Sequence, residues 1–166
     1  MPKLEKVMVC VGGHPSPHLP KQSYESLVTE YNVHVGIKVL TDPQFFNKNL
    51  SEYSDADIYG FMPGNYYYSS RESLQQIVDV FNMGNDMEVI TADTIIKKKS
   101  LGAEFIEYRH SEEIYNAPFF VTAKIAKEVQ FEQKSGEMFK DYMTELVRRG
   151  NMIYHIADPL FTAEMS

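Results

Sequence analysis

Several residue types in this chain can bind a phosphate, a sugar or a base. His14 and His18 flank prolines in a loop that follows two glycines, and an imidazole there can contact phosphate. Residues 97–99 are three lysines and residues 148–149 are two arginines, although runs this short are usually solvated surface. Residues 66–68 are tyrosines, whose rings stack on sugars and bases and whose hydroxyls donate hydrogen bonds. Only the elements that position these groups can decide which of them meet.

Strands and helices alternate along the chain. Short β-branched runs predict strands, and apolar residues at i, i+3, i+4 and i+7 predict helices. The predicted strands are residues 7–11, 33–40, 58–62, 87–90, 103–108, 118–121 and 152–156. The predicted helices are residues 21–31, 44–53, 74–81, 123–129 and 138–147, the third of them begun by a capping box at Ser69 and Glu72. This order predicts one domain over residues 1–166, a Rossmann-type three-layer α/β sandwich with a mixed, mainly parallel sheet.

Polar groups follow three of the predicted strands. The loop of residues 14–20 comes after the first strand, Asp42 after the second, and Gly64 with Asn65 after the third. In open α/β sheets ligands bind beyond the carboxyl ends of the strands. These segments are therefore expected to converge on one pocket.

The composition excludes several classes of protein. The 166 residues are 43% hydrophobic with a net charge of -7, which is typical of a globular domain and not of a basic nucleic-acid sleeve. A single cysteine, Cys10, excludes a disulfide scaffold and favours a reducing compartment. No apolar run is long enough to span a membrane, so we expect a soluble, cytoplasmic protein. The glycine patterns of dinucleotide and P-loop sites are absent, which argues against another class of nucleotide-binding α/β enzyme.

Three stretches resemble family-2 glycosyltransferases, which have the GT-A fold. They are residues 56–65 followed by the capped helix at 70–74, residues 26–27, and residues 140–143 continuing through Gly150 to 155–160. The resemblance implies a GT-A-like sandwich. It also implies an enzyme, a hexosyl- or pentosyltransferase that moves a sugar from a nucleotide diphosphate sugar to a hydroxyl acceptor, with inversion.

The resemblance also implies a set of donor-binding residues. In the family the loop after the first strand and the aspartate after the second hold the nucleotide, and an aspartate can accept two hydrogen bonds from a base edge or a ribose diol. A turn residue before Pro43 is an equally good interpretation of Asp42. The implied nucleotide-sugar-binding residues are Gly12, Gly13, His14, Asp42, Gly64, Asn65 and Arg71.

The sequence departs from the family at the metal site. The family places Asp-x-Asp after the third strand, where it binds Mn²⁺ or Mg²⁺ on the diphosphate. Here residues 62–65 are Met-Pro-Gly-Asn, and the literal Asp-x-Asp at 55–57 precedes the strand. Without these carboxylates, the resemblance implies at most a weak metal site formed by Asn65 and His155. The alternative is a metal-free site in which cations stabilise the diphosphate, with Arg71, Lys124, Arg148 and Arg149 as candidates.

An inverting transferase needs a carboxylate that takes the proton of the acceptor hydroxyl. In the family it belongs to an acidic pair near the start of a late helix. Asp141 matches the second position of that pair, and Lys140 departs from the first. Asp141 is thus the predicted catalytic base, an exposed helix carboxylate is the alternative interpretation, and Glu137 is the reserve candidate.

The acceptor is the least constrained part of the prediction. The expected acceptor-binding residues are Tyr66, Asn116 and Lys124. Compact enzymes of this kind also resemble viral transferases that act in the host cytoplasm on hydroxymethylated cytosine in DNA, so DNA modification stands beside a saccharide as the acceptor class. The missing metal carboxylates suggest one further alternative, an inactive glycosyltransferase-like module that binds a nucleotide sugar or a partner protein.

Overall fold

The strands that the structure describes form one mixed sheet. The computed structural model describes residues 4, 6–12, 30–35, 47–48, 56–63, 66–70, 72–84, 86–100, 103–109, 118–132 and 138–165. Eight strands lie in the order β2-β1-β3-β7-β5-β8-β4, with β6 paired to β5. They are β1 (Val7–Gly12), β2 (Glu30–Val35), β3 (Ile58–Pro63), β4 (Tyr66–Tyr68), β5 (Val89–Ser100), β6 (Ala103–Arg109), β7 (Phe119–Thr122) and β8 (Ile153–Met165).

The pairings give most of the central strands one direction. β1 is parallel to β2 and β3, and β5 is parallel to β8. β7 is antiparallel to both β3 and β5, so it alone is reversed among the six strands from β2 to β8. β1 and β3 end level with one another, with Gly12 opposite Pro63. The predicted mixed and mainly parallel sheet is confirmed.

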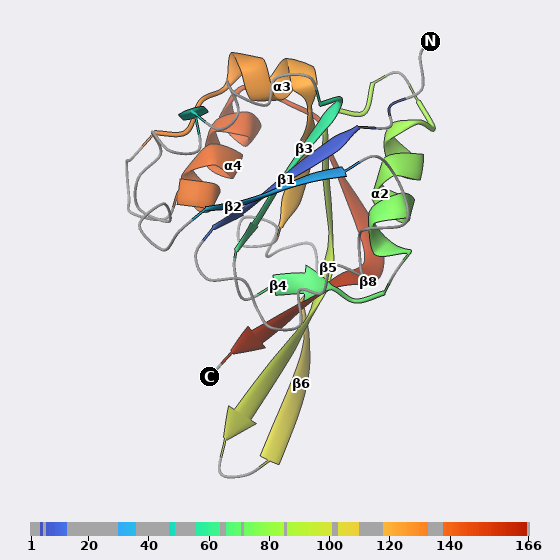
Figure 1. Ribbon diagram of the computed structural model, residues 1–166, viewed down its shortest axis with the longest axis vertical. Coiled ribbons are helices and arrows are strands. Elements are labelled where there is room, and N and C mark those ends of the chain that lie inside the picture. The colour runs from blue at the N-terminus through green and yellow to red at the C-terminus, as the bar shows by residue number, and fades with distance from the viewer. Residues whose placement is uncertain are drawn as a thin grey trace.

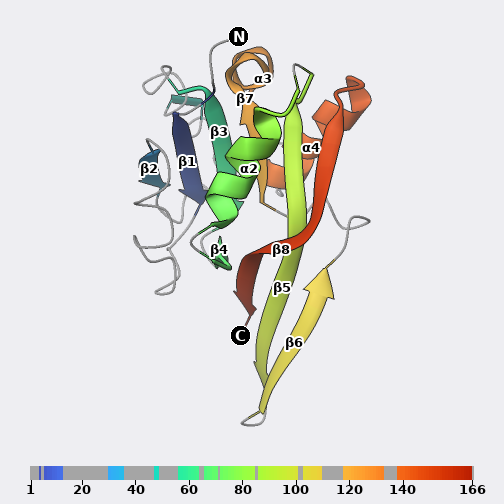
Figure 2. The ribbon, with the colours of Figure 1, turned by 90° about the vertical axis from the view of Figure 1, so that its right-hand side faces the viewer.

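Helices cover both faces of the sheet and make three layers (Figure 2). α2 (Ser73–Phe81) packs on one face through Leu74, Ile77 and Phe81. α3 (Ala123–Glu128) and α4 (Met138–Arg148) cover the other face, as Figure 1 also shows. Successive side chains of a strand point to opposite faces of the sheet. The strands therefore contribute to two hydrophobic clusters, one beneath α2 and one beneath α3 and α4.

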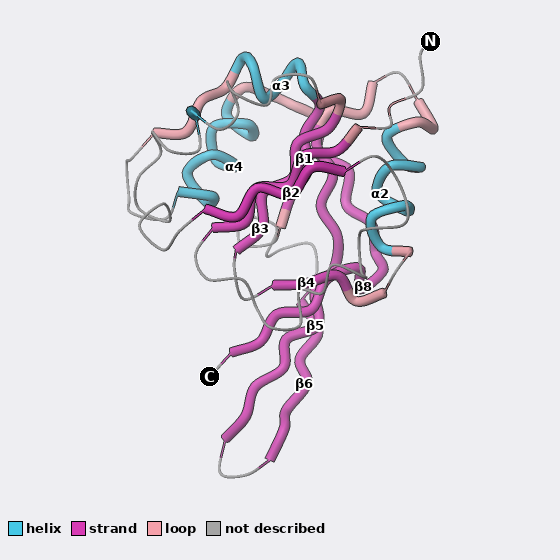
Figure 3. The backbone as a smooth tube through the Cα atoms, viewed as in Figure 1, coloured by secondary structure: helices cyan, strands magenta, loops and turns pink. Residues whose placement is uncertain are grey.

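The long hairpin of β5 and β6 extends beyond the layered body, and β8 follows β5 along part of it (Figures 1 and 3). β5 and β8 stay paired from Val89 opposite Ile153 to Lys98 opposite Met165. The register shifts on either side of Asp93, which faces Pro159. A proline fits a strand at such an irregularity because it cannot donate to a regular ladder.

Gly60 of β3 leaves room for the ring of Phe120 on the neighbouring strand β7. A β-carbon at this position would lie 2.4 Å from Cε2 of Phe120. Phe120 is itself stacked on Phe161, with ring centroids 6.1 Å apart. The close contact between β3 and β7 therefore requires a residue without a side chain.

Most predicted elements are confirmed, with changes at their ends. The strands predicted at 7–11, 58–62, 103–108 and 118–121 and the helices at 74–81, 123–129 and 138–147 match β1, β3, β6, β7, α2, α3 and α4. The helix predicted at 44–53 is described only at 47–48, where it is helical. Gly150, with φ of 79°, follows α4 as expected of a helix stop.

Three predictions about local structure are wrong. The apolar spacing predicts a helix through Tyr31, but Tyr31 lies in β2, which starts at Glu30 because Glu30 pairs with Val7 of β1. The capping box does not form, since the Ser69 hydroxyl pairs with that of Thr162 at 2.8 Å and the N-cap residue of α2 is Glu72, whose side chain makes no capping hydrogen bond. The predicted last strand, 152–156, continues to Met165 because β5 provides a partner over that length.

Among the described residues, none of the helices has both the length and the apolar character that crossing a membrane requires.

Candidate active site

Asp141 lies in the first turn of α4. The helix is amphipathic, and its buried residues, including Tyr142 and Leu146, pack on the sheet. Phe139, in the same first turn, contacts Phe61 of β3 with ring centroids 6.4 Å apart. Because Phe61 is the fourth of the six residues of β3, the start of α4 lies over the carboxyl half of the sheet. The first turn of α4, which carries Asp141, therefore packs on β3 around Phe61.

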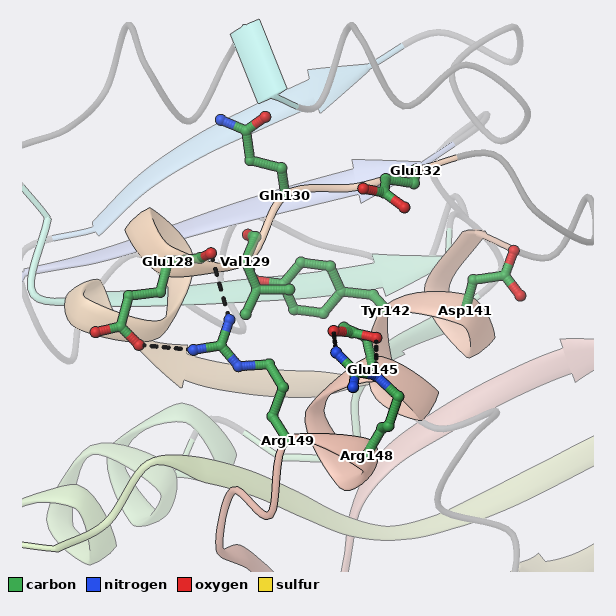
Figure 4. A pocket seen from close by; sticks show the side chains of 9 residues that line it. All are labelled: Glu128, Val129, Gln130, Glu132, Asp141, Tyr142, Glu145, Arg148 and Arg149. Carbon is green, nitrogen blue, oxygen red and sulfur yellow. Dashed lines mark hydrogen bonds and ion pairs between the residues drawn. The ribbon is translucent and has the colours of Figure 1, made fainter.

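A pocket of about 400 Å³ lies between α4, the end of α3 and the segment that follows α3 (Figure 4). This volume is within the range of small-molecule sites. In Figure 4, Asp141 lies toward one end of the pocket and Glu128 toward the other. The lining residues are Glu128, Val129, Gln130, Glu132, Asp141, Tyr142, Glu145, Arg148 and Arg149.

Both arginines of the pocket form ion pairs within its wall. Arg148 binds Glu145 through two nitrogens, at 2.8 Å from Nε and 2.5 Å from Nη2, and this hydrogen-bonded pairing raises the pKa of Arg148. Arg149 binds the carboxylate of Glu128 at 3.1 Å and its backbone carbonyl oxygen at 3.4 Å. The guanidinium of Arg149 is thereby held against the end of α3, whereas the side chain of Arg148 stays largely exposed.

Tyr142 fixes the width of the pocket. Its hydroxyl donates a hydrogen bond of 3.0 Å to the carbonyl oxygen of Val129, and its ring stacks on Phe131 with centroids 4.3 Å apart. Burial raises the pKa of Tyr142 far above its ordinary value, and the charge of Arg149 lowers it only in part. The phenol therefore stays protonated and ties α4 to the opposite wall.

Three polar side chains link β5 and β8 on the face of the sheet that α4 covers. Nε2 of His155 lies 2.6 Å from Oδ1 of Asp93, and Nδ1 lies 2.6 Å from the Thr91 hydroxyl. All three side chains are largely buried. Asp93 as a carboxylate can only accept, so Nε2 donates to it, while Nδ1 accepts from the hydroxyl of Thr91 or, when protonated, donates to it. His155 thus joins the two strands.

The residues predicted to hold a metal do not form a metal site in the described part of the chain. Both ring nitrogens of His155 already have partners, so the ring offers no lone pair to a cation in this arrangement. Asn65, the other expected ligand, lies outside the described residues. No group of three or more His, Cys, Asp or Glu side chains among the described residues can hold a metal ion. We therefore derive no chemical step through a metal.

Most of the predicted donor-binding residues fall outside the part of the chain that the structure describes. Gly12 is within it, at the end of β1. The residues outside it are Gly13, His14, Asp42, Gly64, Asn65 and Arg71, together with Asn116 from the acceptor set and the reserve base Glu137. Their roles stay predictions.

Two predicted acceptor residues do not meet Asp141. Tyr66 is buried in the core beneath α2, on the opposite face of the sheet from α4. Lys124 is exposed on α3 and does not line the pocket. The alternation of Tyr66, Tyr67 and Tyr68, with the outer two buried, follows from the period of a strand.

The sequence prediction missed several polar residues of the site. Glu128, Glu132 and Glu145 line the pocket, but no spacing links the first two to α4 because the packing of α3 and its following segment brings them there. Glu145 was detectable, since it lies one helical turn after Asp141. Asp93 and Thr91 were missed because the strand predicted at 87–90 ended before them.

Comparison with known proteins identifies the class of fold. No protein-family model and no curated protein matches the sequence. Glucosyl-3-phosphoglycerate synthase from Mycobacterium tuberculosis, in complex with Mn²⁺, UDP and phosphoglyceric acid, aligns over 98% of this chain and 72% of its own, with a TM-score of 0.66 and 7% identity.

Two further solved structures share the fold at lower TM-scores. CMP:2-keto-3-deoxy-manno-octonic acid synthetase complexed with CTP aligns over 93% of this chain and 90% of its own, with a TM-score of 0.52 and 10% identity. Inositol-1-phosphate CTP transferase from T. maritima aligns over 98% and 89%, with a TM-score of 0.52 and 12% identity. At these identities the likeness concerns the fold, which is GT-A-like and of the Rossmann type.

Proposed function

We propose that this protein is a transferase that moves a sugar from a nucleotide diphosphate sugar to a hydroxyl acceptor, with Asp141 as the catalytic base. The observation that carries the proposal is the position of Asp141, in the first turn of α4 and in the wall of the pocket between α4 and the segment after α3, in a chain with a GT-A-like fold. Two of the structural neighbours named above are complexes with UDP or CTP, which supports a nucleotide as one substrate.

The proposed step is a single displacement. The carboxylate of Asp141 accepts the proton of the acceptor hydroxyl while that oxygen forms a bond to the anomeric carbon. The bond from that carbon to the diphosphate breaks, and its electron pair leaves with the nucleoside diphosphate. Attack opposite the leaving group inverts the anomeric configuration. A saccharide and hydroxymethylated cytosine in DNA are the two acceptor classes that the sequence suggests.

The test begins with donor binding. Uridine, cytidine, guanosine and adenosine diphosphates and their sugar conjugates are compared by thermal shift with Mn²⁺, with Mg²⁺ and with EDTA, because a ligand of the native state raises its melting temperature. Release of nucleoside diphosphate is then measured with the donor that binds. Asp141→Asn is expected to slow transfer by about a hundred-fold or more while the donor-induced shift is retained.

Asp79→Asn is the matched control, because Asp79 is exposed on α2 at the opposite face of the sheet. It is expected to leave the transfer rate unchanged. Equal rates for Asp141→Asn and the native protein would refute the assignment of the base. Donor binding without any turnover would favour the inactive glycosyltransferase-like module.

Nucleotidyl transfer is a second candidate function. Both cytidylyl-type neighbours are covered over about nine tenths of their own length, compared with 72% for the glycosyl enzyme, so they are closer to this chain in size. The two reactions differ in their products. A nucleotidyltransferase releases pyrophosphate from a nucleoside triphosphate, whereas a glycosyltransferase releases a nucleoside diphosphate from a nucleotide sugar.

A further inference from the structure

The first part of β8 is an open edge of the sheet. β4 lies beyond β8 in the strand order, but it pairs only with residues 161–163. No described strand pairs with residues 153–158 on the side away from β5, and Figure 2 shows this part of β8 at the border of the sheet. The backbone N–H and C=O groups of such an edge can pair with a further strand.

This edge lacks the features that usually prevent strand pairing. Residues 153–156 keep a regular register with β5, and the register shifts and Pro159 come only after them. No lysine or proline stands between positions 152 and 158. Met152, directly before β8, is 57% exposed, and Tyr154 is 43% exposed. An open, regular and apolar edge is suited to the addition of another strand.

The residues of this edge are complementary to a second copy of themselves. In an antiparallel pairing about a twofold axis at Tyr154, this tyrosine lies opposite its own counterpart and Met152 lies opposite Ile156. These three residues share one face of the strand because side chains alternate, and Ile156 belongs to the cluster beneath α2. Each pair on this face is apolar or aromatic, and such cross-strand pairs stabilise a sheet.

The charged residues at the two ends of the edge favour the same antiparallel arrangement. Asp158 is exposed, and in this register it lies opposite Gly150, in the turn that follows α4. Arg148, the last residue of α4, is 71% exposed, so its guanidinium can bind another carboxylate while it retains Glu145. An in-register parallel pairing would instead set Asp158 beside Asp158, and like charges directly opposite are destabilising.

We propose that β8 of one chain pairs with β8 of a second copy, which makes the protein a homodimer with one sheet continuous across a twofold axis. Such an interface uses the same surface on both copies, as the complementarity of residues 152–158 to themselves requires. The proposal concerns assembly and is independent of the proposed transfer reaction.

Sedimentation velocity of the full chain over about 1 to 200 µM tests the proposal, because the dimer fraction rises with protein concentration. We expect a species of twice the mass of one chain. Tyr154→Lys sets two lysines opposite each other at the axis and is expected to weaken the dimer by roughly ten-fold or more. Ile106→Lys is the matched control, since Ile106 is 65% exposed on β6, and it should leave the dimer unchanged. Circular dichroism checks that both variants are folded.

The results distinguish this interface from other assemblies. A native chain that stays monomeric over the whole range would overturn the proposal. Loss of the dimer with Ile106→Lys, alone or to the same extent as with Tyr154→Lys, would place the contact at the hairpin of β5 and β6 or show a general effect of charge. Either result would also refute pairing through β8.

Disulfide formation tests the register and does not depend on the lysine variant. Directly opposite residues of an antiparallel pair have Cα atoms about 4.5 to 5.5 Å apart, which is within the range of a disulfide. With copper phenanthroline as the oxidant, the two thiols of a Tyr154→Cys dimer lose two protons and two electrons and form one S–S bond. We expect a covalent dimer on a non-reducing gel, and no more of it from Ile106→Cys than from the native chain, which contains only Cys10. Failure of Tyr154→Cys to exceed that background would overturn the pairing.

Discussion

Replacing Tyr142 by Phe removes one buried hydrogen bond without removing the aromatic packing around it. The hydroxyl donates to the carbonyl oxygen of Val129 at 3.0 Å, and the ring stacks on Phe131 and Phe119. Tyr142→Phe keeps both stacks but leaves the carbonyl without this donor. Loss of such a bond costs about 1 to 2 kcal/mol in the free energy of unfolding.

Urea denaturation followed by circular dichroism measures this loss. With a slope of about 2 kcal/mol per molar urea, a loss of about 1.5 kcal/mol lowers the midpoint by roughly 0.7 M. Thr144→Val is the control, because the Thr144 hydroxyl donates a hydrogen bond to the backbone carbonyl oxygen of Lys140 at an exposed site on the same helix. That change should cost under about 0.5 kcal/mol. Equal midpoints for Tyr142→Phe and the native protein would refute the anchoring role of the hydroxyl.

The stabilisation by the Tyr142 hydroxyl also depends on pH. Burial raises the pKa of Tyr142 in the folded state, whereas the unfolded chain ionises near pH 10. The protonated phenol therefore favours folding fully below about pH 10, and this contribution is lost as the pH rises above that value. The difference in stability between the native protein and Tyr142→Phe should shrink above pH 10. A constant difference up to pH 11 would contradict the raised pKa.

Two other substitutions test the packing that supports the site. Gly60→Ala should destabilise by about 1 to 3 kcal/mol, because its β-carbon would overlap the ring of Phe120, whereas Gly84→Ala, with nothing within 4 Å, should be nearly neutral by the same urea titration. Thr91→Val should cost about 1 kcal/mol and change the imidazole NMR shifts of His155, since it removes the hydroxyl 2.6 Å from Nδ1. Unchanged shifts would mean that the hydroxyl does not hold the ring.

Local pattern was sufficient for α2, α3 and α4 and for most of the described strands of the body. The apolar spacing of α4 predicted its length and placed Asp141 in the first turn, because apolar residues three and four positions apart form the buried face of a helix. The run Ile58 to Met62 similarly identified β3. Both signals lie within one element and need no knowledge of its neighbours.

The sequence by itself thus determined the α/β class, the order of most elements and the candidate base. Only the tertiary structure decided the surroundings of that base. Packing of α3 beside α4 brought Glu132 to the same pocket, and the register of β5 with β8 brought Asp93 to His155, 62 residues away in the chain. The same pairing extended β8 well past its apolar start. Such contacts depend on which segments lie side by side, and the spacing of residues within one segment does not determine which other segment it pairs with.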